Sequence, residues 1–377
     1  MSGFSRAEQV LGELLRPDLQ GRTAYGAPQL DVPVQLNTNE NSYPVPSAVV
    51  QAMCAALAEA GTGLNRYPDR EFTALREDLA GYLTRSSGVP VAASQLWAGN
   101  GSNEVLLHVV QAFAGPGRAI MGFVPSYSMY PNYALTTGSD WVEGRRGIHR
   151  EDAIDLDPQS AAEQVAQHAP AVVFMASPNN PTGSALDLDV VTAVYDACAR
   201  TIVVVDEAYA EFARPGTPSA LTLLSGRPRL VVSRTMSKAF AFAGGRLGYL
   251  AADPALVDAL RVVRMPYHLS TQTQVVARAA LAHSDLLMAE VEAIKTQRDR
   301  LVEETARMGL VPMPSDANFV LVGGLRDEKA TWRALVARGV LVRDVGLPGH
   351  LRITAGTVAE TDAVLAALSD CLTSTAE

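Results

Sequence analysis

Short apolar runs alternate with stretches of helical periodicity along most of the chain. Five runs carry this pattern: residues 119–123, 171–177, 201–209, 230–235 and 246–252. Several of them lack the polar–apolar alternation of a half-exposed strand, as is typical of strands covered on both faces. Helical stretches such as 103–114 and 186–200 lie between them. This alternation predicts an α/β fold with a mostly parallel sheet flanked by helices.

The two ends of the chain depart from this alternation. Before residue 37, prolines and glycines interrupt any long element, so an arm over residues 1–36 is expected. Two helices are then predicted, at 47–59 with Ser47 as N-cap and at 71–85. They open a large domain that we expect to cover residues 37–280.

A smaller α/β domain is expected at the C-terminal end, over residues 281–377. A long helical region runs from about residue 271 to 308 and leads into it. Three strands are predicted after that helix, near 318–323, 340–345 and 351–355. The N-terminal segment is expected to contribute to this smaller domain.

Composition and charge narrow the class of protein. A length of 377 residues exceeds what one hydrophobic core usually organises, and 48% apolar residues is a globular composition. The net charge of −9 argues against a dedicated nucleic-acid-binding protein. No apolar run approaches the length of a membrane span and the start does not resemble a secretory signal. A cytoplasmic protein is therefore expected.

Few residues that could bind a metal or form a covalent bond to a ligand are suitably placed. The six histidines and three cysteines show no metal-ligand spacing, so no metal site is expected. Only three of the 31 basic residues are lysines: Lys238, Lys295 and Lys329. Lysine is the side chain that forms Schiff bases. Because Lys295 and Lys329 lie in charged, helical stretches, Lys238 is the candidate for such chemistry.

The surroundings of Lys238 suit a covalently bound phosphate cofactor. Hydroxyl residues precede it and a Gly-Gly-Arg follows it: Ser233, Thr235, Ser237, Gly244, Gly245 and Arg246. Hydroxyl, backbone amide and guanidinium groups bind phosphate, while the lysine amine reacts with an aldehyde. The alternative, a lysine that enters a helix from a glycine-rich loop, stays open on this segment alone.

Polar residues follow several of the other predicted strands. Asp206 ends one strand and Tyr209 comes three residues later; a carboxylate there could hold a pyridinium N–H, or could simply cap the next helix. The loop SPNNPTG (177–183) contains Asn180, and GNGSNE (99–104) leads into a helix N-terminus that is able to bind an anion. In FVPSYSMYP (123–131), Tyr127 could stack on a cofactor ring or pack in the core. Each feature alone also has a purely structural interpretation.

The order and spacing of these motifs resemble the fold-type I pyridoxal-phosphate aminotransferases. Within that superfamily the chain is most similar to histidinol-phosphate aminotransferases of the actinobacterial type. The resemblance extends over nearly the whole chain through these segments: AYGAPQL (24–30), LNTNENSYP (36–44), NRYPD (65–69), GNGSNE, FVPSYSMYP, SPNNPTG, DEAYAEF (206–212), SRTMSKAFAFAGGRLGY (233–249), MPYHLS (265–270), SDANFVL (315–321) and VRDVG…HLRIT (342–354). The resemblance implies a large domain that binds the cofactor and a smaller C-terminal α/β domain.

The resemblance also implies roles toward pyridoxal 5'-phosphate as cofactor. Lys238 would be the Schiff-base lysine and the catalytic base that moves the substrate Cα proton. Asp206 would pair with the pyridine nitrogen, Asn180 and Tyr209 would hold the ring oxygen, and Tyr127 would stack on the ring. The groups implied for the cofactor phosphate are Gly101, Ser102, Asn103, Thr235, Ser237 and Arg246. Family members are homodimers with shared sites, in which Tyr67 would reach the phosphate in the partner's site.

Substrate-binding residues are implied in the same way. Arg352 matches the arginine that binds an α-carboxylate, and its planar guanidinium suits bidentate recognition. Arg343 matches an arginine near the substrate phosphate, and Asn180 and Tyr67 border the substrate. Tyr25 and Asn39 align with the arm that closes over the substrate, although a packing role stays open for both.

The implied activity interconverts L-histidinol phosphate and 2-oxoglutarate with imidazole-acetol phosphate and L-glutamate, in L-histidine biosynthesis. An aromatic amino-acid aminotransferase is an alternative, because it shares the fold and most motifs and would need Arg352 but not Arg343. A threonine-phosphate decarboxylase is a second alternative on the same scaffold. A non-enzymatic ligand sensor is a third, against which the acidic charge and the presence of Lys238 both count.

Overall fold

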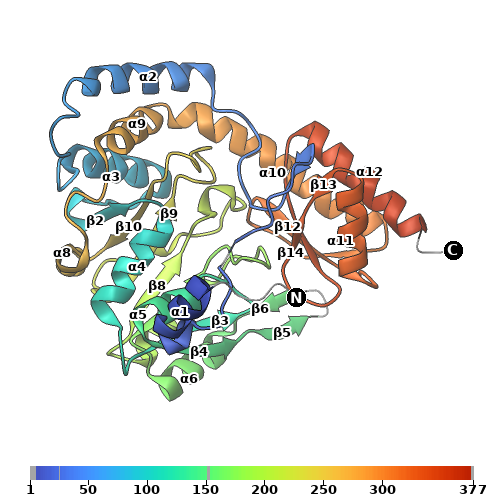
Figure 1. Cartoon of the computed structure of the whole chain (residues 1–377), viewed down its shortest axis with the longest axis horizontal. Coiled ribbons are helices and arrows are strands. Elements are labelled where there is room, and N and C mark those ends of the chain that lie inside the picture. Colours follow the sequence, from blue (N-terminus) through green and yellow to red (C-terminus); the bar gives the residue numbers. More distant parts are fainter. Residues whose placement is uncertain (1–5, 25, 151–152, 375–377) are drawn as a thin grey trace. The chain divides into compact units, whose positions relative to one another are not determined.

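Strands and helices alternate through most of the computed structural model, which describes residues 6–24, 26–150 and 153–374 (Figure 1). The chain divides into two units, Met1–Asp31 and Val32–Glu377. The first contains α1 (Arg6–Leu14) and a 3₁₀ turn, Pro17–Leu19. The predicted arm reached residue 36, whereas Val34–Gln35 forms β1 in the second unit. The division of that unit into a large and a small domain stays a prediction.

The larger sheet of the described residues has seven strands in the order β2-β10-β9-β8-β7-β3-β4. Their bounds are β2 Leu96–Gly99, β3 Ala119–Val124, β4 Asp140–Arg145, β7 Val172–Ala176, β8 Ile202–Asp206, β9 Leu230–Thr235 and β10 Gly248–Ala252. Only β10 runs antiparallel to its neighbours. Every residue of β7, β8, β9 and β10 is buried. The predicted mostly parallel, doubly covered sheet is therefore confirmed.

Helices precede, connect and follow the strands of this sheet (Figure 1). They are α2 Ser47–Gly61, α3 Thr73–Ser87, α4 Ser102–Phe113, α5 Tyr130–Thr137, α6 Pro158–His168, α7 Leu188–Ala197, α8 Pro254–Val263, α9 Thr271–Ala282 and α10 Ser284–Arg307. The N-cap predicted for the first of these was wrong. Pro46 is the N-cap of α2 and Ser47 is already helical, because the carbonyl of Pro46 accepts the first helical hydrogen bond, from the N–H of Val50, over 3.0 Å. A hairpin of β5 (Gly147–Arg150) and β6 (Ala153–Asp155) follows β4.

The long predicted helix after residue 270 is two helices, because the chain bends at His283 between α9 and α10. In Figure 1, α10 runs from α9, beside the larger sheet, toward β12 (Phe319–Gly323). The helix therefore leads from the seven-stranded sheet to the four-stranded sheet that contains β12.

The smaller sheet of the described residues has four antiparallel strands in the order β11-β12-β15-β14. Its other strands are β11 Val311–Pro312, β14 Arg343–Asp344 and β15 Leu351–Thr354, and helices α11 (Glu328–Ala337) and α12 (Val358–Ser374) accompany it. The strand predicted at 340–345 is divided: Val340–Leu341 is β13, which pairs in parallel with β1. Residues 34–35 thus pair with a strand from the C-terminal part of the chain.

The parallel strands of the larger sheet all end at one edge. Because polar residues follow those ends in sequence, the topology gathers them along that edge, where ligands bind in α/β sheets. Within the described residues, no helix is both long and apolar enough to cross a membrane.

Candidate active site

Asp206 lies at the centre of the gathered edge, as the last residue of β8. Its neighbours in register are Ala176 of β7 and Ser233 of β9. Ser233 Oγ donates to Asp206 Oδ1 over 2.8 Å, and Tyr130 Oη donates to Oδ2 over 2.9 Å. Burial raises the pKa of the Asp206 carboxyl, while these two hydroxyl donors lower it. The carboxylate is therefore held in a fixed orientation by the protein itself.

Lys238 follows the neighbouring strand, β9, and its side chain is half-buried. Its Nζ donates to the backbone oxygen of Thr38 over 2.9 Å. Burial, together with the positive charges of Arg352 and Arg246, lowers the pKa of Lys238 to about 8, although Glu40 acts in the opposite direction. A lysine in this environment has a far larger neutral, nucleophilic fraction at neutral pH than an exposed lysine.

Three consecutive residues, 37–39, connect predicted site residues from both sheets. Arg352 Nη2 donates to Asn37 O over 2.6 Å, and Lys238 contacts the next carbonyl, that of Thr38. Asn39 Nδ2 donates to the hydroxyl oxygen of Tyr209 over 3.0 Å. This segment brings Lys238, Tyr209 and Arg352 to one place.

Asn39 is buried rather than presented on a surface arm, with only 1% of its surface exposed. Its Oδ1 accepts from Thr354 Oγ1 over 3.0 Å, and its backbone N–H donates to the same hydroxyl oxygen over 3.1 Å. Its φ of 56° lies in the left-handed region, which asparagine tolerates better than most residues. The packing alternative for Asn39 therefore has direct structural support.

The start of α4 forms a cradle beside β10. Gly101 is the N-cap with a φ of 87°, and the first helical residues are Ser102 and Asn103. A Cβ at Gly101 would meet the guanidinium of Arg246, and a Cβ at Gly248 would meet the backbone of Gly101 and Ser102. Glycine at both positions allows a helix N-terminus and an arginine to approach each other closely, which is an anion-binding arrangement.

Hydroxyl and aromatic residues border this cradle. Ser237 donates from its backbone N–H to Thr235 Oγ1 over 3.1 Å, and the Thr235 hydroxyl donates to Ser237 Oγ over 3.0 Å. Tyr127 Oη donates to Asn103 Oδ1 over 3.3 Å. The residues predicted for the phosphate and the ring therefore lie in connected positions at the ends of β2, β3 and β9.

Arg352 and Asn180 meet at the other side of the site. Arg352 Nη1 donates to Asn180 Oδ1 over 2.6 Å, and its guanidinium lies 5.2 Å from the ring centre of Phe319. The edge of Tyr209 packs on the same Phe319 ring at 5.1 Å between centroids. Arg352, on β15 of the smaller sheet, thus contacts the loop after β7.

Arg343 is directly opposite Arg352 in the register of β14 and β15. Side chains of directly opposed residues project from the same face of a sheet, so both arginine side chains leave that face at neighbouring positions. Arg343 Nη1 is buried and has no hydrogen-bond partner among the described residues. Like charges in this arrangement favour an anion between or beside them.

The donor set fits the cofactor that the sequence resemblance implies. The buried carboxylate of Asp206 matches a ring nitrogen, the amine of Lys238 matches an aldehyde, and the cradle at Gly101 with Arg246 matches a phosphate. The two glycines of the cradle support this fit, because a Cβ at Gly101 or Gly248 would fill the space proposed for the phosphate.

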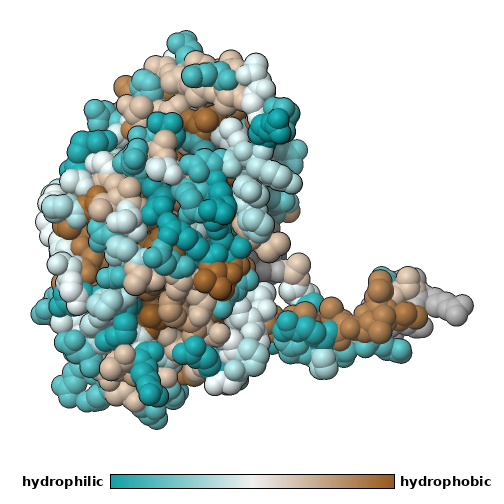
Figure 2. All heavy atoms as spheres, turned by 90° about the vertical axis from the view of Figure 1, so that its left-hand side faces the viewer, coloured by the Kyte–Doolittle hydropathy of each residue, from teal (hydrophilic) through white to brown (hydrophobic). Residues whose placement is uncertain are grey.

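Two predicted residues are not part of this cluster as described. Tyr67 is 79% exposed and its ring stacks on Tyr267, with 4.4 Å between centroids. Leu64, Val262 and Met265 are also exposed large hydrophobics, and on the face shown in Figure 2 brown hydrophobic residues lie among teal hydrophilic ones.

Tyr25, which was predicted to close over the substrate, lies outside the described residues.

The sequence left several contacting groups without a role. Asn37 and Thr38 act through backbone carbonyls, for which no side-chain pattern exists. Tyr130 belongs to the segment FVPSYSMYP, but nothing local indicated that its hydroxyl would reach Asp206, 76 residues away. Ser233 stood in the hydroxyl-rich stretch before Lys238, but its partner is the carboxylate rather than a phosphate group.

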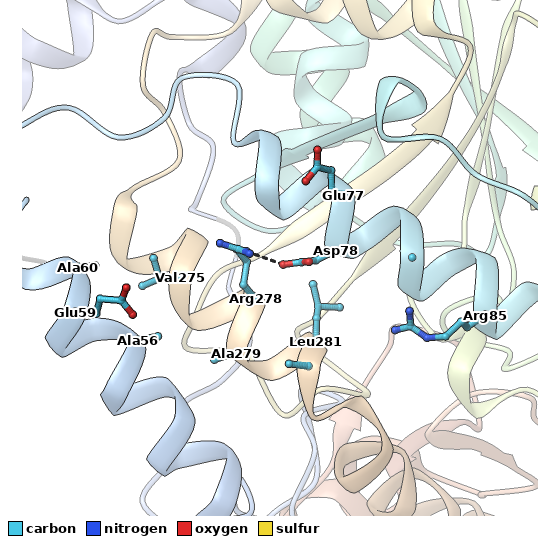
Figure 3. A pocket seen from close by; sticks show the side chains of 12 residues that line it. Ala56, Glu59, Ala60, Glu77, Asp78, Arg85, Val275, Arg278, Ala279 and Leu281 are labelled. Atoms are coloured by element: carbon cyan, nitrogen blue, oxygen red, sulfur yellow. Dashed lines mark hydrogen bonds and ion pairs between the residues drawn. The ribbon is translucent and has the colours of Figure 1, made fainter.

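A separate hollow of about 700 Å³ lies between α2, α3 and α9 (Figure 3). Arg278 reaches across it to Asp78, with Nε 2.6 Å from Oδ2, while Glu59 and Glu77 also line it (Figure 3). None of the described site residues is among those lining it. We assign it no role.

Comparisons with known proteins agree with this arrangement. The family model described as aminotransferase class I and II matches residues 32–368. A histidinol-phosphate aminotransferase of Paenarthrobacter aurescens is 58% identical over 364 residues, which cover 96% of this chain and 96% of that relative. One of Frankia casuarinae is 58% identical over 95% of this chain and 90% of its own length.

A solved structure of histidinol-phosphate aminotransferase from Sinorhizobium meliloti, in complex with pyridoxal-5'-phosphate, superposes with a TM-score of 0.83. It is 27% identical, and the match covers 100% of both chains. The family indicated by the sequence motifs is thereby confirmed. The chain belongs to the class I and II aminotransferases.

Proposed function

We propose that the chain is a histidinol-phosphate aminotransferase of L-histidine biosynthesis with pyridoxal 5'-phosphate as its cofactor. It moves an amino group between L-histidinol phosphate and 2-oxoglutarate, giving imidazole-acetol phosphate and L-glutamate. Relatives with that name at 58% identity support the proposal. The structural observation that carries it is the pair of opposed arginines, Arg343 and Arg352, at the edge of the site.

The two arginines suit two unlike anionic substrates. Arg352, between Asn180 and Asn37, presents a fixed guanidinium for a carboxylate of glutamate or 2-oxoglutarate. Histidinol phosphate has no carboxylate but carries a phosphate, for which the buried Nη1 of Arg343 is available. An enzyme specific for aromatic amino acids would need only the first of these.

When bound, pyridoxal 5'-phosphate supplies an aldehyde that captures the amine and a pyridine ring that accepts electrons. Lys238 then acts as the base that moves the proton of the substrate Cα. Asp206 holds a proton at the ring nitrogen, with its carboxylate fixed by Tyr130 and Ser233. Asn180 and Tyr209 would hold the ring oxygen, and Tyr127 would stack on the ring.

The phosphate of the cofactor is held by the cradle at the start of α4. Its proposed donors are Gly101, Ser102, Asn103, Thr235, Ser237 and Arg246. A helix N-terminus and a guanidinium both favour a doubly charged group. Orientation of the reacting groups and this anion binding are the main contributions of the protein.

We further propose a homodimer in which Tyr67 of one subunit borders the phosphate and substrate in the site of the other. The high exposure of Tyr67 and its stacking on Tyr267 support this arrangement. Tyr25 and Asn39 are proposed to lie near the substrate, with Asn39 acting through its contact with Tyr209. The cytoplasmic location stays a prediction.

The proposal predicts substrate preferences that depend on Arg343. The wild-type enzyme should have a much higher kcat/KM for histidinol phosphate than for phenylalanine. Arg343→Ala should lower kcat/KM for histidinol phosphate roughly 10- to 100-fold, the effect of losing a charge-assisted hydrogen bond. Its kcat/KM for glutamate should change far less, because the proposed partner of the glutamate carboxylate is Arg352 and not Arg343. Steady-state kinetics on the three substrates measure both effects.

Arg338→Ala is the matched control, because Arg338 is exposed on the neighbouring helix and its removal takes away the same charge. A preference for phenylalanine with no effect of Arg343→Ala would instead indicate an aromatic aminotransferase. Carbon dioxide release from threonine phosphate without 2-oxoglutarate would indicate the decarboxylase.

A further inference from the structure

We propose that Tyr130 is a positioning residue for Asp206: its hydroxyl fixes the carboxylate and keeps it ionised opposite the ring nitrogen of the cofactor. The inference rests on the proposed function, since it assigns a further residue to the same site. It concerns a side chain that touches neither substrate nor cofactor in the proposed arrangement and acts through Asp206.

The hydrogen bond between Tyr130 and Asp206 is buried and joins two separate elements. Tyr130 is the first residue of α5 and is fully buried. Its Oη lies 2.9 Å from Oδ2 of Asp206, while Ser233 Oγ lies 2.8 Å from Oδ1. Each carboxylate oxygen therefore has one hydroxyl donor, and the two hydrogen bonds together fix the orientation of the carboxylate.

Aromatic packing fixes the direction of the Tyr130 hydroxyl. The ring stacks on Phe174 of β7, with 4.5 Å between centroids and 7° between planes. Tyr127 packs against it edge-on at 5.5 Å, and Tyr133 lies at 6.4 Å. Because the ring is held on these sides, the phenol cannot turn away from Asp206 without disturbing the core.

The electrostatic consequence follows from what surrounds Asp206. Burial and the adjacent charge of Glu207 raise the pKa of the Asp206 carboxyl, whereas Ser233 and Tyr130 lower it. Glu207 is itself paired with Arg234, with 2.7 Å between Oε2 and Nη2. A phenol is a stronger acid than an alcohol and so a strong donor to a carboxylate. Loss of the Tyr130 hydroxyl should shift Asp206 toward its neutral form.

A neutral Asp206 would no longer favour a protonated ring nitrogen. The cofactor should then bind less tightly and the substrate Cα proton should leave more slowly. Contacts of substrate with Arg352 and Arg343 would be unaffected. The expected signature is a lower kcat with little change in KM, which a general loss of structure would not produce.

The test compares two ligands in one variant. Apoprotein is titrated with pyridoxal 5'-phosphate and with its 1-deaza analogue, which lacks the ring nitrogen, and tryptophan fluorescence reports the Kd. Wild type should prefer the natural cofactor. In Tyr130→Phe this preference should shrink roughly 10-fold or more, as expected for a lost hydrogen bond to a charged group. The pH at which the absorbance band of the bound cofactor changes should move as well.

The ratio of the two Kd values is internal to each variant, so a modest loss of stability cancels in it. Tyr249→Phe is the matched control, because Tyr249 is fully buried in β10 and its hydroxyl has no partner among the described residues. It should leave the ratio unchanged.

Two results would overturn the inference. In the first, Tyr130→Phe weakens both ligands equally or has no effect, while wild type discriminates between them. In the second, Tyr249→Phe changes the ratio as much as Tyr130→Phe does. A wild-type protein that forms no covalent bond between Lys238 and pyridoxal 5'-phosphate is a different outcome, which would remove the proposed function itself.

Discussion

The reactivity of Lys238 is set by its immediate neighbours rather than by its residue type. Its amine is half-buried, it contacts the carbonyl of Thr38, and Arg352 and Arg246 add positive charge nearby. Burial of the amine and these two positive charges disfavour its protonated form, and they lower the pKa of Lys238 to about 8. Lys295, by contrast, pairs with the carboxylate of Glu292 on the same helix, α10.

This environment predicts the pH dependence of cofactor capture by the apoprotein. Only the neutral amine attacks an aldehyde, and its fraction grows as pH rises through the pKa. With a pKa of about 8, the capture rate should rise from pH 6.5 to about 9 and then level off. Stopped-flow absorbance measures the rate, with Lys238→Ala as the control that should show no covalent phase. A rate that keeps rising to pH 10 would mean that Lys238 behaves as an exposed lysine.

At the scale of elements, the site depends on how closely β10 approaches the start of α4. Gly248 begins β10 and pairs with Gly99 of β2 and Thr235 of β9. A Cβ there would collide with the backbone of Gly101 and Ser102. Because those atoms belong to a helix start and not to a flexible side chain, the helix itself would have to move.

Gly248→Ala should therefore displace the phosphate cradle. We expect a loss of stability of about 1–3 kcal/mol from overpacking, together with a weaker affinity for the cofactor. Denaturant unfolding and fluorescence titration with pyridoxal 5'-phosphate measure the two effects. Gly244→Ala is the control, because a Cβ at Gly244 meets nothing within 4 Å. Equal behaviour of the two variants would show that the close approach has no functional importance.

At the scale of the whole molecule, the exposed Tyr67 has no function that one subunit explains. Tyr67 is 79% exposed and stacks on Tyr267. In a single subunit the apolar surface of this pair stays in contact with water unless another surface covers it. The proposed homodimer supplies that surface and makes each active site composite.

Mixing two inactive variants tests this composite site. Lys238→Ala removes the reactive amine and Tyr67→Ala removes the residue proposed to cross the interface, so each homodimer should be strongly impaired. In a mixed dimer, one site combines Lys238 of one subunit with Tyr67 of its partner and is intact. Activity after co-refolding should exceed the sum of the separate variants and approach one quarter of wild type, as random pairing predicts. Activity equal to that sum would place Tyr67 and Lys238 in the same subunit's site.

The fold and the family could be predicted from the sequence because their signals are local or linear. Apolar runs identified β3, β7, β8 and β9 to within a few residues, and motif order indicated an aminotransferase, which the comparisons confirm. Element ends were less predictable. The break at His283 and the division of residues 340–345 depend on packing against other elements, which periodicity does not report.

The candidate site divides in the same way. Lys238, Asp206, Asn180 and Arg352 are chemically distinctive and stand at strand ends or within a recognisable motif, so the sequence singled them out; their roles stay predictions. Tyr130 and the carbonyls of Asn37 and Thr38 are ordinary groups whose importance comes from what they touch.

The sequence by itself determined which reactive groups this chain has and that parallel strands would carry them to one edge of a sheet. This was possible because the hydrophobic pattern of a strand and the chemistry of a side chain are both properties of a short stretch of sequence. Only the tertiary structure decided that Tyr130 donates to Asp206 and that Arg343 lies opposite Arg352 on the adjacent strand. It also decided that residues 37–39 join Lys238, Tyr209 and Arg352. These contacts join residues far apart in the chain, so register and packing determine them and no local pattern encodes them.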